Sequence, residues 1–198
     1  MKRILPLIIL LISALAASAA GPLDKCISAM RATPSLKVAY TLTAEGNKSQ
    51  GMLTLAGDRF TLSAPGMMTW FDGKTQWTYS SAMGEVNIVE PTPEELQQIN
   101  PFAIIRTFST SYDIRNLGSK AGVSTVQLTA RSKSADIRSV RILLSDATSF
   151  PTRITLTLSS GKTVDIAVNQ VMKGGKLPDT FFRFDRKLYP KVQVVDLR

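Results

Sequence analysis

The sequence predicts a mainly β (α+β) fold, with one large antiparallel sheet that curls and helices against one face. Apolar and polar residues alternate with period two along about a dozen short segments, which is the pattern of half-buried strands. Turn dipeptides such as Asp72-Gly73 and Ser160-Gly161 separate neighbouring segments. One stretch in the middle of the chain changes to helix caps and a helical apolar pattern, so helices interrupt a run of strands.

The first twenty residues have the three-part pattern of a secretory signal peptide. Lys2 and Arg3 precede an apolar run over residues 4–17, and small residues then place the cleavage after Ala19 or Ala20. The run is shorter than the roughly 20 residues of a membrane span. We therefore expect residues 1–20 to be removed and residues 21–198 to form one exported domain, with the formal net charge of +9 lowered to +7 by the loss of Lys2 and Arg3. A single cysteine provides no internal disulfide, which favours the periplasm as the compartment.

The mature chain is expected to begin with a helix and to continue in strands. Pro22 suits the first helical position, and the apolar residues Leu23, Cys26, Ile27 and Met30 share one helical face. Cys26 lies in that stripe, where a small buried hydrophobic residue is the simpler interpretation than a reactive thiol. Strands are expected at residues 37–44, 51–56, 59–64, 67–71, 75–79 and 85–89.

A helical insert is expected after these strands. Thr92, Pro93 and Glu95 form a helix start with an N-cap, a first-turn proline and a capping-box glutamate, and this helix should run through Ile99. Asn100-Pro101 repeats the cap and proline before a second apolar segment. That segment is apolar around most of its circumference, so it should be covered on one side and face an apolar space on another.

The remaining strands follow the insert. They are expected at residues 112–117, 123–130, 138–144, 153–158, 162–171, 181–185 and 191–197. In the pair around Ser160-Gly161, apolar residues alternate with polar ones on both strands, so this pair should have one apolar and one solvated face.

The composition excludes several kinds of catalytic site. With no histidine and one cysteine, the chain can form no Ser-His-Asp triad, no imidazole zinc site and no CxxC redox pair. Gly73-Lys74-Thr75 resembles the end of a P-loop, but the position that requires the upstream glycine is Met68. Ser159 and Lys162 have Ser-x-x-Lys spacing in a hairpin turn rather than at a helix start. We therefore expect no enzymatic activity, no cofactor or metal, and no nucleic-acid partner.

A family resemblance rests on several stretches of the sequence. Residues 70–79, Trp-Phe-Asp-Gly-Lys-Thr-Gln-Trp-Thr-Tyr, resemble the hairpin of LolA-type periplasmic lipoprotein carriers. Residues 100–105 resemble the helix of that family, and residues 51–55 with Arg59-Phe60 resemble its early hairpin. Phe182-x-Phe184 and residues 192–195 are similar to its last strands, so the resemblance covers most of the mature chain.

The resemblance implies a half-open β-barrel with a helical lid, whose hollow holds the acyl chains of lipoproteins during transfer from the inner to the outer membrane. It also implies acylated lipoproteins as cargo, an inner-membrane lipoprotein-releasing ABC transporter as donor, and an outer-membrane acceptor that the sequence does not identify. We expect a monomer. A lipid chain in water loses about 0.8 kcal/mol per methylene relative to burial, so a soluble carrier must cover it.

The residues expected to form the cavity and its lid are apolar and come from the first strands and the helical insert. They are Leu42, Leu53, Leu55, Phe60, Leu62, Met68, Trp70, Trp77, Ile88, Phe102, Ile104, Ile105 and Phe108. Met52, Met67, Met68 and Met83 are flexible side chains suited to a promiscuous cavity, although ordinary core is the alternative for each. The resemblance implies Arg59 as a latch that holds the lid shut.

Two questions stay open at the level of sequence. A periplasmic lipid-sensing or regulatory domain on the same fold is the alternative function, while an enzyme acting on lipid or glycan is disfavoured by the missing histidine and the scattered acids. The basic surplus either steers the protein toward acidic lipid headgroups or an acidic partner, or only maintains solubility.

Overall fold

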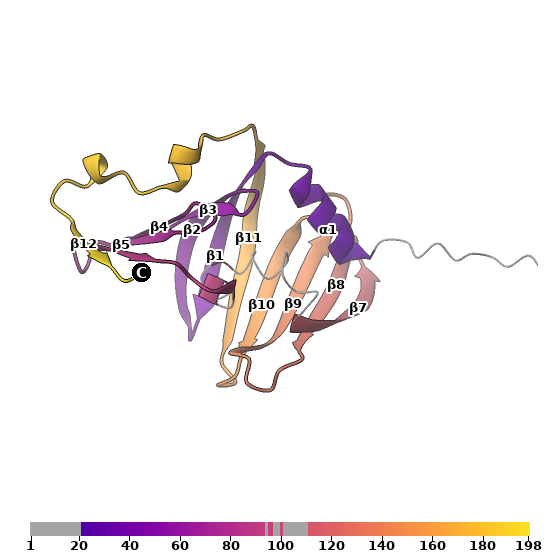
Figure 1. Cartoon of the computed structure of the whole chain (residues 1–198). Coiled ribbons are helices and arrows are strands. Elements are labelled where there is room, and N and C mark those ends of the chain that lie inside the picture. The colour runs from indigo at the N-terminus through magenta and orange to yellow at the C-terminus, as the bar shows by residue number, and fades with distance from the viewer. Residues whose placement is uncertain (1–20, 94, 97–99, 101–110) are drawn as a thin grey trace, which may run out of the picture.

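The computed structural model describes residues 21–93, 95–96, 100 and 111–198 (Figure 1). The predicted signal peptide, residues 1–20, lies outside the described residues, as do the predicted lid residues Phe102, Ile104, Ile105 and Phe108. In the part of the chain that is described, no helix is long and apolar enough to cross a membrane.

The fold is mainly β: the described residues include an α-helix of ten residues, α1, and a sheet of twelve strands. The order across the sheet is β12-β6-β5-β4-β3-β2-β1-β11-β10-β9-β8-β7. The elements are α1 (Pro22–Arg31), β1 (Ser35–Ala44), β2 (Asn47–Ala56), β3 (Arg59–Ala64), β4 (Met67–Phe71), β5 (Gln76–Ser80), β6 (Glu85–Val89), β7 (Tyr112–Lys120), β8 (Val123–Ala130), β9 (Ile137–Ser145), β10 (Pro151–Leu158), β11 (Thr163–Gly174), the 3₁₀ helices η1 (Asp179–Phe182) and η2 (Arg186–Leu188), and β12 (Gln193–Asp196). The predicted class and the predicted antiparallel pairing are confirmed, and every neighbouring pair except β12 with β6 is antiparallel.

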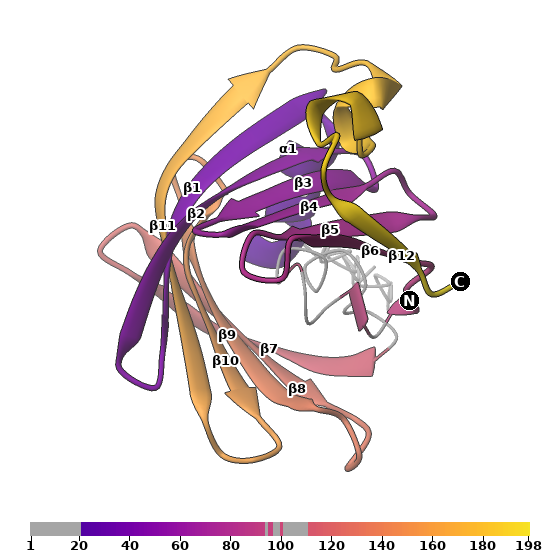
Figure 2. The ribbon, with the colours of Figure 1, turned by 90° about the vertical axis from the view of Figure 1, so that its left-hand side faces the viewer.

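The sheet is open, and β12 and β7 are its two edges. β1 and β11 pair in its middle, where the first and second series of strands meet. Figure 2 shows the strands of the first series and those of the second series diverging from this pair and lying on two sides of a common interior. The main hydrophobic core is on that inner face and includes Leu36, Val38, Leu128, Ile142 and Ile154.

α1 covers part of the inner face and contacts β8 and β9. Asp24 Oδ2 accepts a hydrogen bond of 3.0 Å from the Gly21 amide at the start of the helix, where a carboxylate is favoured by the helix dipole. Leu23 and Cys26 are buried against the strands, as the helical spacing predicts. Cys26 is completely buried and therefore a core residue, and this burial raises the pKa of its thiol to about 12.

The predicted capping box at Thr92 is present. The Glu95 amide donates to Thr92 Oγ1 at 3.3 Å, and Glu95 Oε2 accepts from the Thr92 amide at 2.8 Å. The Leu96 amide donates to the Thr92 carbonyl at 3.0 Å, which is a helical hydrogen bond. The rest of this predicted helix, residues 97–99, lies outside the described residues.

The segment between β11 and β12, residues 175–192, is here called the C-terminal segment, and it corrects two predictions. The strand predicted at residues 181–185 is wrong, because the segment forms η1 and then η2 while it crosses the outer face of the sheet without a strand partner. Phe182, the last residue of η1, is completely buried. The segment reaches the end of the sheet at which β6 begins, and the Gln193 amide donates to the Gly84 carbonyl at 3.1 Å. β12 therefore runs parallel to β6 rather than antiparallel.

Candidate functional site

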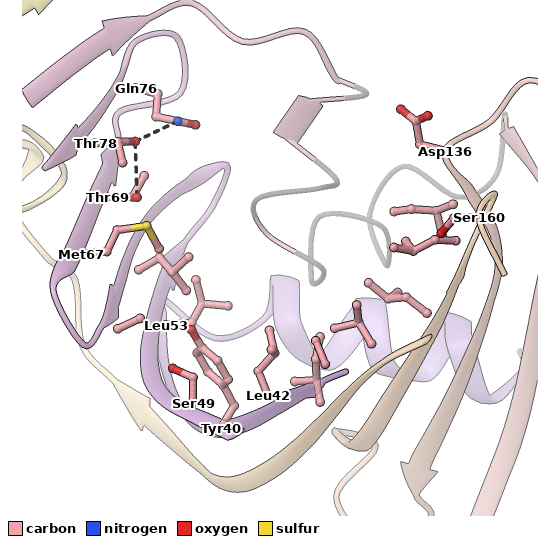
Figure 3. A pocket seen from close by; sticks show the side chains of 18 of the residues that line it. Tyr40, Leu42, Ser49, Leu53, Met67, Thr69, Gln76, Thr78, Asp136 and Ser160 are labelled. Atoms are coloured by element: carbon pink, nitrogen blue, oxygen red, sulfur yellow. Dashed lines mark hydrogen bonds between the residues drawn. The ribbon is translucent and has the colours of Figure 1, made fainter. Parts of the chain in front are cut away.

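A cavity of about 800 Å³ lies on the inner face of the sheet. Strands β1 to β5 form one side of it, and β10, β11 and the start of β9 form the other. Figure 3 shows the side chains of both sides converging on the same space. The residues around it are Tyr40, Leu42, Ala44, Ser49, Leu53, Leu62, Ala64, Met67, Thr69, Gln76, Thr78, Asp136, Ile137, Leu156, Leu158, Ser159, Ser160, Val164 and Ile166.

The side formed by β10 and β11 is apolar. Leu156, Leu158, Val164 and Ile166 project into the cavity at alternate positions, and Leu156 pairs with Val164 across the two strands. Period-two alternation explains this arrangement, because the intervening residues point to the outer face. Asp136, Ser159 and Ser160 are exposed and form a polar rim at this side.

The side formed by β4 and β5 carries a row of polar groups (Figure 3). Gln76 Nε2 donates to Thr78 Oγ1 at 3.1 Å, and Thr78 Oγ1 lies 3.4 Å from Thr69 Oγ1. Gln76 is 6% exposed, and its Oε1 has no hydrogen-bond partner among the described residues. An apolar cavity with a few ordered polar groups is the usual composition of a small-molecule site, where the polar groups orient the ligand.

Tyr40 lies at the base of this polar side, where a glycine gives it space. A Cβ at Gly51 would lie 2.3 Å from the Tyr40 hydroxyl oxygen, so only glycine accommodates the ring in this position. The Tyr40 hydroxyl can donate a hydrogen bond, and burial raises its pKa above the ordinary value, which disfavours the phenolate further.

Three of the predicted site residues lie around the cavity, namely Leu42, Leu53 and Leu62. Two others, Leu55 and Phe60, belong to the same inner face but are packed in the adjoining core. The Phe60 ring lies 5.2 Å from the Phe71 ring between centroids and packs in the core rather than lining the cavity.

The structure does not bring Met68, Trp70, Trp77 and Ile88 to the cavity. In the register of β4, β5 and β6, these residues alternate with Met67, Thr69, Gln76 and Thr78, which face the cavity, so they point to the outer face. There the Trp70 ring packs edge-on against Phe184 and Tyr189, with centroid distances of 5.7 Å to each. Among the other methionines singled out, Met67 lies at the cavity, and Met83 is 70% exposed in the turn before β6.

Arg59 contacts the C-terminal segment. Its guanidinium forms an ion pair with Asp179 and lies 4.7 Å from the centroid of the Phe182 ring. Because the lid residues lie outside the described part of the chain, the role of Arg59 as a lid latch stays a prediction.

The hairpin that carries the family resemblance is held by its aspartate. Asp72 Oδ1 accepts from the Lys74 and Thr75 amides at 3.1 and 3.0 Å, and its Oδ2 accepts from Arg183 at 3.0 Å. Burial alone would raise the pKa of Asp72, but these amides and the Arg183 charge together hold it below its ordinary value. Asp72 therefore orders the turn and also fastens the C-terminal segment.

Sequence reasoning missed the β10–β11 side of the cavity. Its alternation was a usable signal for one apolar face, but nothing local indicates that this face meets β1 to β5 across a hollow. Among the described residues, no three His, Cys, Asp or Glu side chains come together in a way that could hold a metal ion.

Comparisons with known proteins identify a family and several similar structures. A family model described as outer membrane lipoprotein carrier protein LolA matches residues 13–161. The structure is similar to that of an uncharacterised conserved protein from Thermus thermophilus, with a TM-score of 0.61 and 12% identity over 87% of this chain and 98% of that one. A LolA superfamily protein from Nitrosomonas europaea has a TM-score of 0.44 and 14% identity over 84% of this chain and 99% of that one. No curated protein sequence matches the chain.

Proposed function

The chain belongs to the outer membrane lipoprotein carrier (LolA) family, and on this basis we propose that it shields the acyl chains of lipoproteins in its cavity and carries them across the periplasm from the inner to the outer membrane. The observation that carries the proposal is the cavity of about 800 Å³ between two sides of the sheet. It lies within the range of about 300–1,000 Å³ typical of small-molecule sites.

The walls of the cavity suit an acyl chain. Leucine side chains from β1 to β3, and leucine, valine and isoleucine side chains from β10 and β11, surround it. The polar groups are those of the β4–β5 side and the rim, together with Tyr40 on β1 and Ser49 on β2. At about 0.8 kcal/mol per buried methylene, a chain of about 14 methylenes gains roughly 11 kcal/mol on leaving water. Such a gain is sufficient to hold lipid during diffusion, and a releasing partner must offset it.

The proposal extends to features beyond the described residues. Residues 1–20 act as a cleaved signal peptide, and the apolar segment containing Phe102, Ile104, Ile105 and Phe108 acts as a lid that completes a half-open barrel. An inner-membrane lipoprotein-releasing ABC transporter loads the carrier, which acts as a monomer, and an outer-membrane acceptor unloads it.

The first experiment asks what the native protein carries. The protein is purified under native conditions and examined by mass spectrometry for bound acyl lipid or lipoprotein, and it is then tested for release of lipoproteins from spheroplasts. We expect bound acyl chains and release. A clean apo protein that releases nothing would contradict the carrier function and favour a lipid-sensing domain.

The second experiment asks whether this cavity is the site. Leu158→Trp places a larger side chain in the cavity, and Thr157→Trp places the same side chain on the outer face of the same strand. We expect Leu158→Trp to weaken binding of a fluorescent fatty acid by about tenfold. The larger side chain takes space that the ligand would fill, and the apolar contacts that the ligand then loses are worth about 1.4 kcal/mol or more. Equal effects of the two variants would place the ligand elsewhere.

A further inference from the structure

The segment from Arg186 to Lys191, here called the basic tip, presents an apolar side chain between positive charges. Leu188 is 75% exposed, the highest exposure among the large hydrophobic residues of the described chain. Arg186 and Lys187 precede it, and Lys191 follows it, and all three are exposed. In Figures 1 and 2 the segment that carries η1 and η2 stands outside the strands of the sheet.

The basic tip is held in place rather than loosely attached. Tyr189, next to Leu188, packs its ring against Tyr79 and Phe184 at centroid distances of 5.0 and 5.4 Å, and against Trp70 at 5.7 Å. Asp185 Oδ1 accepts from the Lys187 amide at 2.9 Å, which fixes the start of η2. With Tyr189 turned inward and this short helix fixed, the backbone at Leu188 is ordered before contact, which lowers the entropic cost of docking.

The charge on the basic tip is available to a partner. Within the described residues, neither Lys187 nor Lys191 forms an ion pair, whereas Arg59, Arg183 and Arg198 are each paired with an aspartate. Arg186 donates to the Val192 carbonyl and keeps its positive charge. In the part of the chain that the structure describes, the positive charges of the tip therefore form no salt bridge with a carboxylate.

We propose that the basic tip is a docking site for the surface of an anionic lipid bilayer. Lysine and arginine side chains are attracted to anionic headgroups, and a leucine held between them can enter the boundary between headgroups and acyl chains. The tip lies on the side of β4 and β5 opposite to the cavity, since Trp70 and Tyr79 face outward. Docking there brings the protein to a membrane without covering the cavity, and the proposal does not depend on the identity of the cavity ligand.

Vesicle co-sedimentation tests the proposal. Vesicles of phosphatidylcholine alone are compared with vesicles that also contain phosphatidylglycerol, and every protein is used in the same processed form, verified at its N-terminus by mass spectrometry. We expect binding to the anionic vesicles only. Leu188→Ser should weaken this binding by about tenfold, as expected for withdrawing one leucine side chain from an apolar environment.

A matched control separates the basic tip from exposed apolar residues in general. Leu117 is 50% exposed in β7, at the opposite edge of the sheet from β12, so Leu117→Ser should leave binding unchanged. Lys187→Gln with Lys191→Gln should weaken binding by about fivefold per charge and reduce its sensitivity to salt. Thermal unfolding of each variant verifies that the fold is intact.

Three results would overturn the proposal. The first is failure of the unaltered protein to bind anionic vesicles. The second is equal loss on Leu117→Ser and Leu188→Ser. The third is unchanged vesicle binding by Leu188→Ser together with loss of lipoprotein release, which would assign the basic tip to a protein partner instead.

Discussion

Replacing Phe182 with alanine tests whether the C-terminal segment is an integral part of the fold. The Phe182 side chain is completely buried, with the Arg59 guanidinium 4.7 Å from its ring centroid and the Phe181 ring at 5.2 Å. Removal of a buried phenylalanine costs about 3–5 kcal/mol. Loss of the cation–π contact adds about 0.5–1 kcal/mol, so we expect a total of about 4 kcal/mol for Phe182→Ala.

The neighbouring residue provides the control. Phe181 is 37% exposed, so Phe181→Ala removes a ring of the same size from a position that is still in contact with water, at an expected cost of about 1 kcal/mol. In a domain of this length, 1 kcal/mol lowers the melting temperature by about 2–4 °C. Phe182→Ala should therefore lower it by about 8–16 °C, and Phe181→Ala by about 2–4 °C.

Thermal unfolding gives the melting temperature of both variants, and urea unfolding followed by tryptophan fluorescence gives their free energy of unfolding. Limited proteolysis shows whether the C-terminal segment separates before the sheet unfolds. If the segment opens on its own, the global transition moves less, but cleavage after residue 174 accelerates for Phe182→Ala alone. Equal urea midpoints and equal cleavage rates for the two variants would refute the argument that Phe182 anchors this segment.

Two further predictions concern titratable groups. Because the pKa of Asp72 is depressed in the folded protein, its contribution to stability is present above the unfolded value near 3.8 and is lost as the pH falls through the lower folded value. Asp72→Asn should therefore make the free energy of unfolding depend less steeply on pH in the acid range. An unchanged dependence on pH would contradict the contact with Arg183. Because burial raises the pKa of Cys26 to about 12, a disulfide reagent at pH 8 should label this thiol only after unfolding, and rapid labelling of the native protein would contradict the packing of α1.

Features determined by short-range interactions could be predicted from the sequence. The turn at Asp72 is held by contacts two and three residues away, and the cap at Thr92 by contacts with Glu95. The helical stripe that includes Leu23 and Cys26 is likewise legible within one short segment. In such cases the residues that determine the conformation are close together in the sequence.

Which face of β4 is turned toward the cavity could not be predicted in the same way, because both of its faces are covered. Phe71 packs against Phe60 on the inner face, while Trp70 packs on the outer face against Phe184 and Tyr189, more than a hundred residues further along the chain. Alternation identifies two faces, and it distinguishes the inner one only when the other meets solvent. The C-terminal segment removes that distinction, so Trp70 was expected at the cavity although it lies on the opposite face.

The positive charge of the chain was expected to serve either steering or solubility, and the basic tip allows these uses to be separated. Charges that steer an encounter act before contact, so replacing Lys187 and Lys191 should lower the association rate with anionic vesicles and its dependence on salt. Leu188 acts only after contact, so Leu188→Ser should raise the dissociation rate and leave the association rate nearly unchanged. Stopped-flow mixing with vesicles measures both rates. If both substitutions changed only the association rate, Leu188 would not enter the bilayer, and the tip would act through charge alone.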